Sequence, residues 1–115
     1  MANLKRGALH WRHQRLSALA LVPLTLVFIG LLPTLATADH EAVVGLMETI
    51  IVPVFLVALL GAGLWHMKLG LETIIDDYVG RGSCGSALKV LVIAAAVVLA
   101  SVAVVSLVML MVGQA

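Results

Sequence analysis

Residues 87–112, ALKVLVIAAAVVLASVAVVSLVMLMV, decide the fold class of this chain. Within the interior of this stretch the only polar side chains are those of Ser101 and Ser106. An α-helix rises about 1.5 Å per residue, so about 20 apolar residues cross the hydrocarbon core of a bilayer. A helix also satisfies its own backbone hydrogen bonds in lipid. Residues 87–112 are therefore predicted to form a helix that spans a membrane.

Two further apolar segments of similar length precede it, at about 16–38 and 46–75. The whole chain is 63% hydrophobic and only 11% charged, whereas soluble domains carry about 25% charged residues. We expect one all-α membrane domain over residues 1–115, with three transmembrane helices. Pro23, Pro33 and Pro53 fall within these segments, where membrane helices tolerate proline, and are expected to cause local bends.

Several functions are excluded by composition. The net charge is +1 and no basic patch is interleaved with aromatic residues, so we expect no binding of nucleic acid. The single Cys84 allows neither an internal disulfide nor a cluster of thiolate ligands. The chain also has no glycine-rich loop for a nucleotide. Three helices with short loops and no water-soluble domain indicate a component of a larger assembly, without catalytic activity alone.

Basic residues predict the orientation of the three helices. Four precede the first span and three flank the connection between the second and third spans, namely Lys5, Arg6, Arg12, Arg15, Lys68, Arg81 and Lys89. The other connection and the C-terminal tail contain none. By the positive-inside rule we expect Met1 in the cytoplasm and Ala115 in the periplasm of a bacterial inner membrane.

An alternative for the first span is a cleaved signal peptide, because residues 36–38, ATA, are typical of a signal peptidase site. The apolar segment before it exceeds 20 residues, however, whereas the apolar part of a signal peptide has about 7–15. We therefore expect this segment to remain as a membrane helix.

The stretch LWHMKLGLETIIDDYVG, residues 64–80, carries the candidate functional groups. Ionisable side chains within membrane helices are costly, and are usually functional or paired. A neutral imidazole at His66 is suited to binding haem iron, and Gly63 and Gly70 on the same helical face leave room for a flat cofactor. The spacing is equally compatible with a histidine that hydrogen-bonds a neighbouring helix or extends to the membrane interface.

Asp77 follows His66 by eleven residues, which places both on one side of a helix and about 16 Å apart along it. Tyr78 presents a phenolic hydroxyl at the membrane boundary, where it is suited to the carbonyl oxygen of a lipophilic head group. Taken alone, an interfacial tyrosine is more often an aromatic anchor at the membrane surface.

The pattern H-x3-G-x6-D-Y, formed by His66, Gly70 and the pair Asp77-Tyr78, resembles the signature of a hydrophobic membrane anchor of succinate dehydrogenase, respiratory complex II. Of the two anchors in such a complex, the resemblance is to the one that is counted as the fourth subunit. The segment HWRHQRLSALALVPLTL, residues 10–26, is similar to the start of the first helix in such anchors. Three spans, an internal N-terminus and the chain length also match, so the resemblance covers essentially the whole chain.

The resemblance implies a role for each of these residues. His66 would be one axial ligand of a b-type haem, and the companion anchor, which is the third subunit of the complex, would supply the other. Arg15 would pair with a haem propionate, for which His13 is a weaker candidate. Tyr78 would hydrogen-bond ubiquinone, and Asp77 would help to orient the quinone site and its proton supply.

The same resemblance implies a heteromeric helix bundle made with the companion anchor, which holds the flavoprotein and iron–sulfur subunits at the membrane. Two alternatives remain from the sequence. An anchor of fumarate reductase would be built from nearly the same residues. A small transporter would use His66 as a proton relay.

Overall fold

The computed structural model describes residues 2–113, with side chains from residue 4 onward, and is helical almost throughout this range. Three long helices and one short helix follow one another: α1 (Ala2–Thr37), α2 (His40–Glu48), α3 (Ile51–Tyr78) and α4 (Ser83–Met111). No strand occurs among the described residues. Met1 and Ala115, whose sides of the membrane were predicted above, lie outside the described residues.

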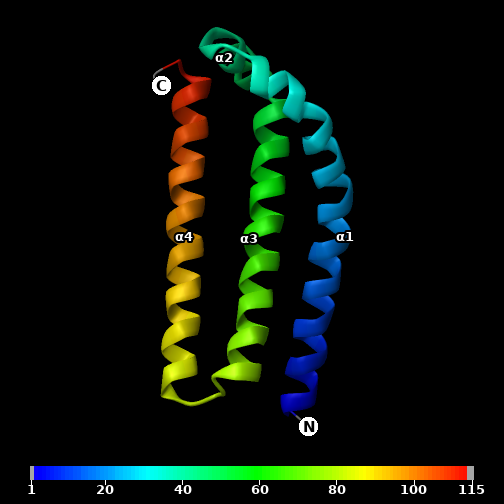
Figure 1. Ribbon diagram of the computed structural model, residues 1–115, viewed down its shortest axis with the longest axis vertical. Helices are drawn as coiled ribbons and strands as arrows, with labels where there is room; N and C mark the ends of the chain where they lie inside the picture. Colours follow the sequence, from blue (N-terminus) through cyan, green and yellow to red (C-terminus); the bar gives the residue numbers. More distant parts are fainter. Residues whose placement is uncertain (1, 114–115) are drawn as a thin grey trace.

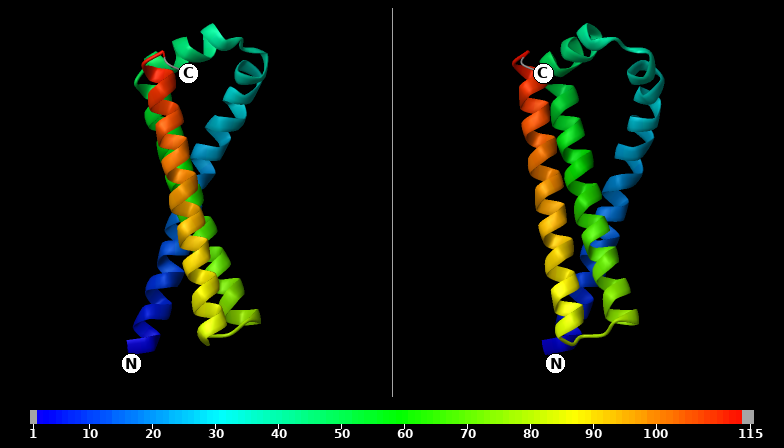
Figure 2. Two further views of the ribbon diagram at one scale, coloured as in Figure 1. Left: turned by 90° about the vertical axis from the view of Figure 1, so that its left-hand side faces the viewer. Right: turned by 60° about the vertical axis from the view of Figure 1, so that its left-hand side comes forward.

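The three long helices run up, down and up along a body of 53 × 26 × 21 Å (Figure 1). Helix α3 lies in the middle and packs against α1 on one side and α4 on the other. Figure 2 shows α1 crossing the α3–α4 pair at an angle, while α3 and α4 remain side by side. The N-terminal end of α1 and the turn between α3 and α4 lie at one end of the body, and α2 lies at the other.

All three long helices are long and apolar enough to cross a membrane, over Leu4–Thr37, Ile51–Tyr78 and Ser83–Met111. This confirms the prediction of an all-helical membrane protein with three spans. The chain is a multi-pass membrane protein. Helix α1 begins well before the expected span at 16–38, so its basic first turns continue the same helix beyond the apolar segment.

The prolines of α1 bend the helix without ending it. Helix α1 is continuous through Pro23 and Pro33, and Figure 1 shows it curving toward α2. A proline inside a helix removes one backbone hydrogen bond and crowds the carbonyl four residues earlier, which favours such a bend.

Pro53 has a stronger effect than the expected bend. In a continuous helix the ring of Pro53 would crowd the carbonyl of Thr49. Proline also has no backbone N–H to donate to that carbonyl. The helix is interrupted at that residue, where Thr49 adopts extended backbone angles, and α3 starts at Ile51. Pro53 then lies in the first turn of α3, where no backbone N–H has a partner within the helix. The expected second span at 46–75 therefore begins in α2.

Helix α2 is defined at its start by Asp39. The carboxylate of Asp39 accepts a hydrogen bond from the backbone N–H of Ala42 at 2.9 Å, which caps the helix. At the other end, the hydroxyl of Thr49 donates to the carbonyl of Leu46 at 2.6 Å. The short connection between α1 and α3 is thus itself a capped helix rather than an open loop.

The turn between α3 and α4 depends on glycine at two positions. Gly80 follows the end of α3 with φ of +90°, a conformation that favours glycine, and its N–H donates to the carbonyl of Ile75 at 3.0 Å. Gly85 is buried in the first turn of α4, where a Cβ would overlap the Gly80 carbonyl oxygen. The close approach of α4 to the end of α3 therefore requires Gly85.

Very few side chains are buried within the chain itself. Among residues 4–113, the buried ones are Ser17, Met47, Pro53, Leu69, Ile75 and Gly85. Lipid tails are as apolar as leucine, so exposed leucine and valine side chains on membrane helices do not need a protein core. The packing that this chain has is concentrated where α3 contacts its two neighbours.

Candidate functional site

His66 lies on α3 and contacts α1 through a hydrogen bond. Its Nδ1 is 3.0 Å from the hydroxyl oxygen of Ser17, a buried residue of α1 that is 8% exposed. The Ser17 hydroxyl also donates to the backbone carbonyl of Gln14 at 2.9 Å. The histidine is therefore not a free interfacial side chain, because one ring nitrogen is held by the neighbouring helix.

A hollow beside His66 is lined by side chains of α1, of which Ala18, Leu21, Val22 and Leu26 are apolar and Thr25 carries a hydroxyl. Residues Ala18, Val22 and Thr25 lie on one face of α1, and Arg15 continues that face one turn toward the N-terminus. The Arg15 guanidinium is exposed and lies over the ring of Trp11, 5.4 Å from its centroid. The imidazole and the guanidinium thus border the same face of α1.

The two glycines near His66 have different surroundings. A Cβ at Gly63 would meet no atom within 4 Å, so open space remains there. A Cβ at Gly70 would lie 3.6 Å from the side-chain nitrogen of Gln14. Gly63 therefore has open space beside it, whereas at Gly70 the amide of Gln14 lies within van der Waals contact of the position that a Cβ would take. The Gln14 side-chain oxygen is buried and has no hydrogen-bond partner within the described chain.

Further toward the N-terminal end of α1, the two helices are joined by His10. Its Nε2 lies 3.1 Å from the hydroxyl of Thr73. Together with Ser17–His66 and the contact of Gln14 with Gly70, this pair forms a row of polar contacts that we call the α1–α3 polar seam. The α3 members are three to four residues apart and therefore share one face of the helix.

A polar hollow of about 440 Å³ lies at the end of the seam, lined by Arg6, Gly7, His10, Thr73, Asp76, Asp77, Arg81 and Lys89. It contains Asp77, one of the predicted site residues, which faces α1 as His66 does. Asp76 is paired with Lys89 of α4, with 2.6 Å between carboxylate oxygen and amine. Asp76 thus forms a contact between α3 and α4.

Tyr78 does not line this hollow. Its side chain is 86% exposed, and its hydroxyl has no hydrogen-bond partner among the described residues. The structure therefore brings Asp77 together with basic side chains of α1 and α4, and places Tyr78 on the outer surface at the same level of α3.

Trp65 is surrounded by basic side chains. The ring of His13 is tilted against it with centroids 6.0 Å apart, and the Lys68 amine lies 4.8 Å from its centroid. Lys68 also pairs with Glu72 one turn away at 3.2 Å. The weaker propionate candidate His13 therefore packs against α3 rather than standing free beside Arg15.

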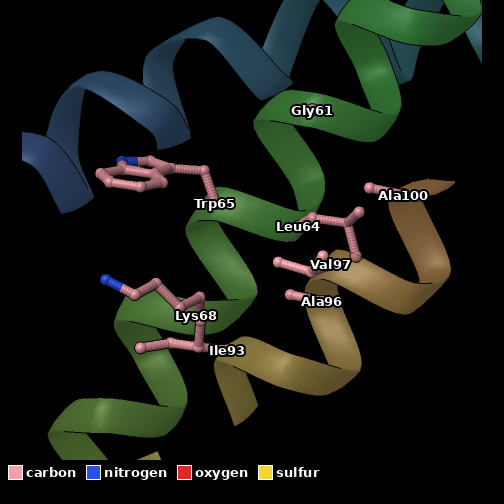
Figure 3. A pocket seen from close by; sticks show the side chains of 8 residues that line it. All are labelled: Gly61, Leu64, Trp65, Lys68, Ile93, Ala96, Val97 and Ala100. Carbon is pink, nitrogen blue, oxygen red and sulfur yellow. The ribbon is translucent and has the colours of Figure 1, made fainter. Parts of the chain in front are cut away.

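A separate apolar groove of about 270 Å³ runs between α3 and α4 (Figure 3). Small residues make it shallow, including Gly61, Ala96 and Ala100. In Figure 3 the side chains of Trp65 and Lys68 extend from α3 on the side away from α4. The groove shares no lining residue with the hollow beside His66.

No group of three or more His, Cys, Asp or Glu side chains that could hold a metal ion occurs within residues 4–113. A bare metal ion would need about four such ligands. His66 instead offers a single imidazole, so a metal bound there would take its other ligands from outside this chain.

The model of the succinate dehydrogenase/fumarate reductase transmembrane subunit family matches residues 1–109. The chain belongs to this family. No curated protein and no solved structure shows a significant match to it. Membership in the succinate dehydrogenase/fumarate reductase transmembrane subunits replaces the small transporter as an explanation for the ionisable residues of α3, and makes the chain a membrane component of a complex with catalytic partners.

Sequence reasoning missed the partner of His66. Ser17 is a polar residue inside an apolar stretch, which was a signal, but its contact lies 49 residues away and depends on how α1 and α3 align. The pairs His10–Thr73 and Asp76–Lys89 were missed for the same reason.

Proposed function

We propose that this chain is the hydrophobic membrane anchor that forms the fourth subunit of succinate dehydrogenase. It holds the flavoprotein and iron–sulfur subunits at the membrane, shares a b-type haem with the companion anchor and helps to form the site where ubiquinone is reduced. The observation that carries the proposal is His66, held through one ring nitrogen by Ser17 and bordering an apolar hollow.

The surroundings of His66 fit a haem. A haem shared by two chains would be held in this chain by the imidazole of His66, and the α1 face beside it would supply apolar contact to the macrocycle. The open space at Gly63 adds room on α3. When bound, a b-type haem supplies reversible one-electron chemistry. The second axial ligand would come from the companion anchor.

Arg15 is the residue of this chain proposed to hold a propionate. It continues the α1 face that lines the hollow and lies at the end nearer the basic side of the protein. Its guanidinium is exposed, stacked on Trp11, and has no carboxylate within salt-bridge distance among the described residues. A planar guanidinium recognises a carboxylate through two parallel hydrogen bonds.

Asp77 and Tyr78 are proposed to contribute to the quinone site at the cytoplasmic end of α3. The exposed Tyr78 hydroxyl is free to donate a hydrogen bond to a quinone carbonyl, since no residue of the described chain accepts it. Asp77 lines a polar hollow that water can reach, which suits a group that supplies protons to a reduced quinone. The remaining walls would come from the companion anchor and the iron–sulfur protein.

The proposed orientation places the N-terminal end of α1 and the α3–α4 turn in the cytoplasm. The seven basic side chains lie toward this end of the body, four on α1 before its apolar stretch and three around the α3–α4 turn. The membrane is then the bacterial inner membrane, where a succinate dehydrogenase delivers electrons to quinone.

The test is His66→Leu in the purified complex, compared with His40→Leu, which changes an exposed histidine of α2 at the opposite end. We expect the first variant to alter or abolish the b-type bands of the reduced-minus-oxidised spectrum and the second to leave them intact. An unaltered bis-histidine spectrum in His66→Leu would contradict the assignment. Quinol-dependent fumarate reduction exceeding succinate oxidation would instead favour a fumarate reductase anchor.

A further inference from the structure

Three atoms form a short hydrogen-bond chain between α3 and α1. The first is Nδ1 of His66, the second is the Ser17 hydroxyl oxygen at 3.0 Å, and the third is the backbone carbonyl oxygen of Gln14, 2.9 Å further on. Ser17, which is 8% exposed, is the one polar residue among residues 4–113 that is buried as a whole. A buried hydroxyl lowers stability unless it is hydrogen-bonded. The Ser17 hydroxyl meets this requirement through its contacts with Gln14 and His66.

The Gln14 carbonyl favours one tautomer of the imidazole, because a carbonyl oxygen can only accept a hydrogen bond. A serine hydroxyl has one hydrogen and donates it here to the Gln14 carbonyl. The two contacts are compatible with each other when the hydroxyl donates to the Gln14 carbonyl and its oxygen accepts from Nδ1–H of His66. A neutral imidazole has only one N–H, so Nε2 is left with its lone pair.

We propose that Ser17 is a positioning residue for the haem ligand His66. It accepts the Nδ1 proton, fixes the tautomer in which Nε2 is the ligating nitrogen and prevents rotation of the ring. This inference rests on the proposed haem site. Histidines that bind metals generally donate their other N–H in this way, and the partner strengthens the ligand as a donor. Within the described chain His66 has no other hydrogen-bond partner.

Removal of the hydroxyl has a defined consequence for the iron. Without an acceptor for Nδ1–H, the ring is a weaker electron donor and the ferric state is less stabilised, so the midpoint potential of the haem rises. A lost hydrogen bond changes an equilibrium by roughly two- to tenfold. The bond exists in both oxidation states, so only the part by which it favours the ferric state shifts the potential; at 59 mV per tenfold for one electron, the rise is therefore at most about 59 mV.

The experiment compares Ser17→Ala, Ser17→Thr and Ser101→Ala in the purified complex by redox titration of the visible haem bands and by low-temperature EPR of the ferric haem. Ser101→Ala is the matched control, because Ser101 donates only to the carbonyl of Val97 within α4. We expect Ser17→Ala to raise the potential and shift the low-spin EPR signal. Ser17→Thr keeps the hydroxyl and should retain both properties, as should Ser101→Ala.

A wild-type potential and EPR signal in Ser17→Ala would overturn the inference, and so would equal shifts in the alanine and threonine variants. If the alanine variant does not assemble, Ser17→Cys is measured instead, because it keeps the volume and is only a weak acceptor. His66→Leu in the same series separates the two hypotheses: if it retains the bis-histidine spectrum, the haem assignment has failed. If it loses that spectrum while Ser17→Ala is unchanged, only the role of Ser17 has failed.

Discussion

The substitution Gly85→Ala tests how α4 is attached to α3. The added methyl group would overlap the Gly80 carbonyl oxygen, lie 3.2 Å from its carbon and contact Ile75 at 3.6 Å. Gly80 has little freedom to move away, because its φ is +90° and its N–H is bonded to the carbonyl of Ile75. The turn must therefore open, or α4 must shift outward along its first turn.

The size of the effect follows from two opposing contributions. Overpacking at a closely packed position costs about 1–3 kcal/mol. Alanine returns up to about 1 kcal/mol through its better helix propensity. The atoms that the methyl group meets belong to the backbone, so we take the upper part of the overpacking range, about 2–3 kcal/mol. The net loss is then about 1–2 kcal/mol, which lowers the ratio of folded to unfolded hairpin by roughly 5- to 30-fold.

The assay is an SDS titration in mixed micelles, followed by energy transfer between a donor on α3 and an acceptor on α4. Gly45→Ala serves as the control, because Gly45 is an exposed helical glycine of α2 with no atom within 4 Å of a new Cβ. The control should match the wild type or unfold at slightly higher SDS. Equal midpoints for both variants would refute the argument that the Gly80 carbonyl limits the approach of α4.

Three other outcomes follow from the structure and the proposals. A reporter that is active only in the periplasm should be active when fused after Ala115, and inactivity there would contradict the orientation. Asp76→Asn and Lys89→Met, alone and combined, should show a coupling free energy of about 0.2–1 kcal/mol in the unfolding of the complex, because the pair is partly exposed; additive effects would show that the contact contributes nothing. Tyr78→Phe should lower succinate-to-quinone electron transfer by roughly 5- to 150-fold, with near-normal reduction of a soluble acceptor dye. A parallel loss of both activities would make Tyr78 structural.

The helical fold could be predicted because its main constraints are local. Twenty or more apolar residues in lipid must form a helix, and this holds for each long segment regardless of its neighbours. The interruption of the helix at Thr49 was harder to predict from the sequence. Pro53 was expected to bend a helix, whereas the structure ends α2 before Thr49, four residues ahead of this proline, and starts α3 at Ile51.

The candidate site likewise has a part that local sequence predicts and a part that depends on how the helices pack. Helical periodicity is sufficient to place His66 and Asp77 on one face of α3, and in the structure both lie toward α1. Periodicity does not give the register between α1 and α3, which decides that Ser17 meets His66 and that Gln14 lies beside Gly70. These contacts join residues about 50 positions apart and required the structure.

The scarcity of buried side chains makes it possible to map the missing neighbours genetically. In the chain alone, most outward-facing positions contact only lipid, so exchange of one apolar residue for another should leave its own folding almost unchanged. The same exchanges will be harmful in the assembled complex wherever a companion protein packs. A saturation mutagenesis profile selected for respiration, with the profile for membrane insertion of the isolated chain subtracted, would therefore outline the footprint of each partner on α1, α3 and α4.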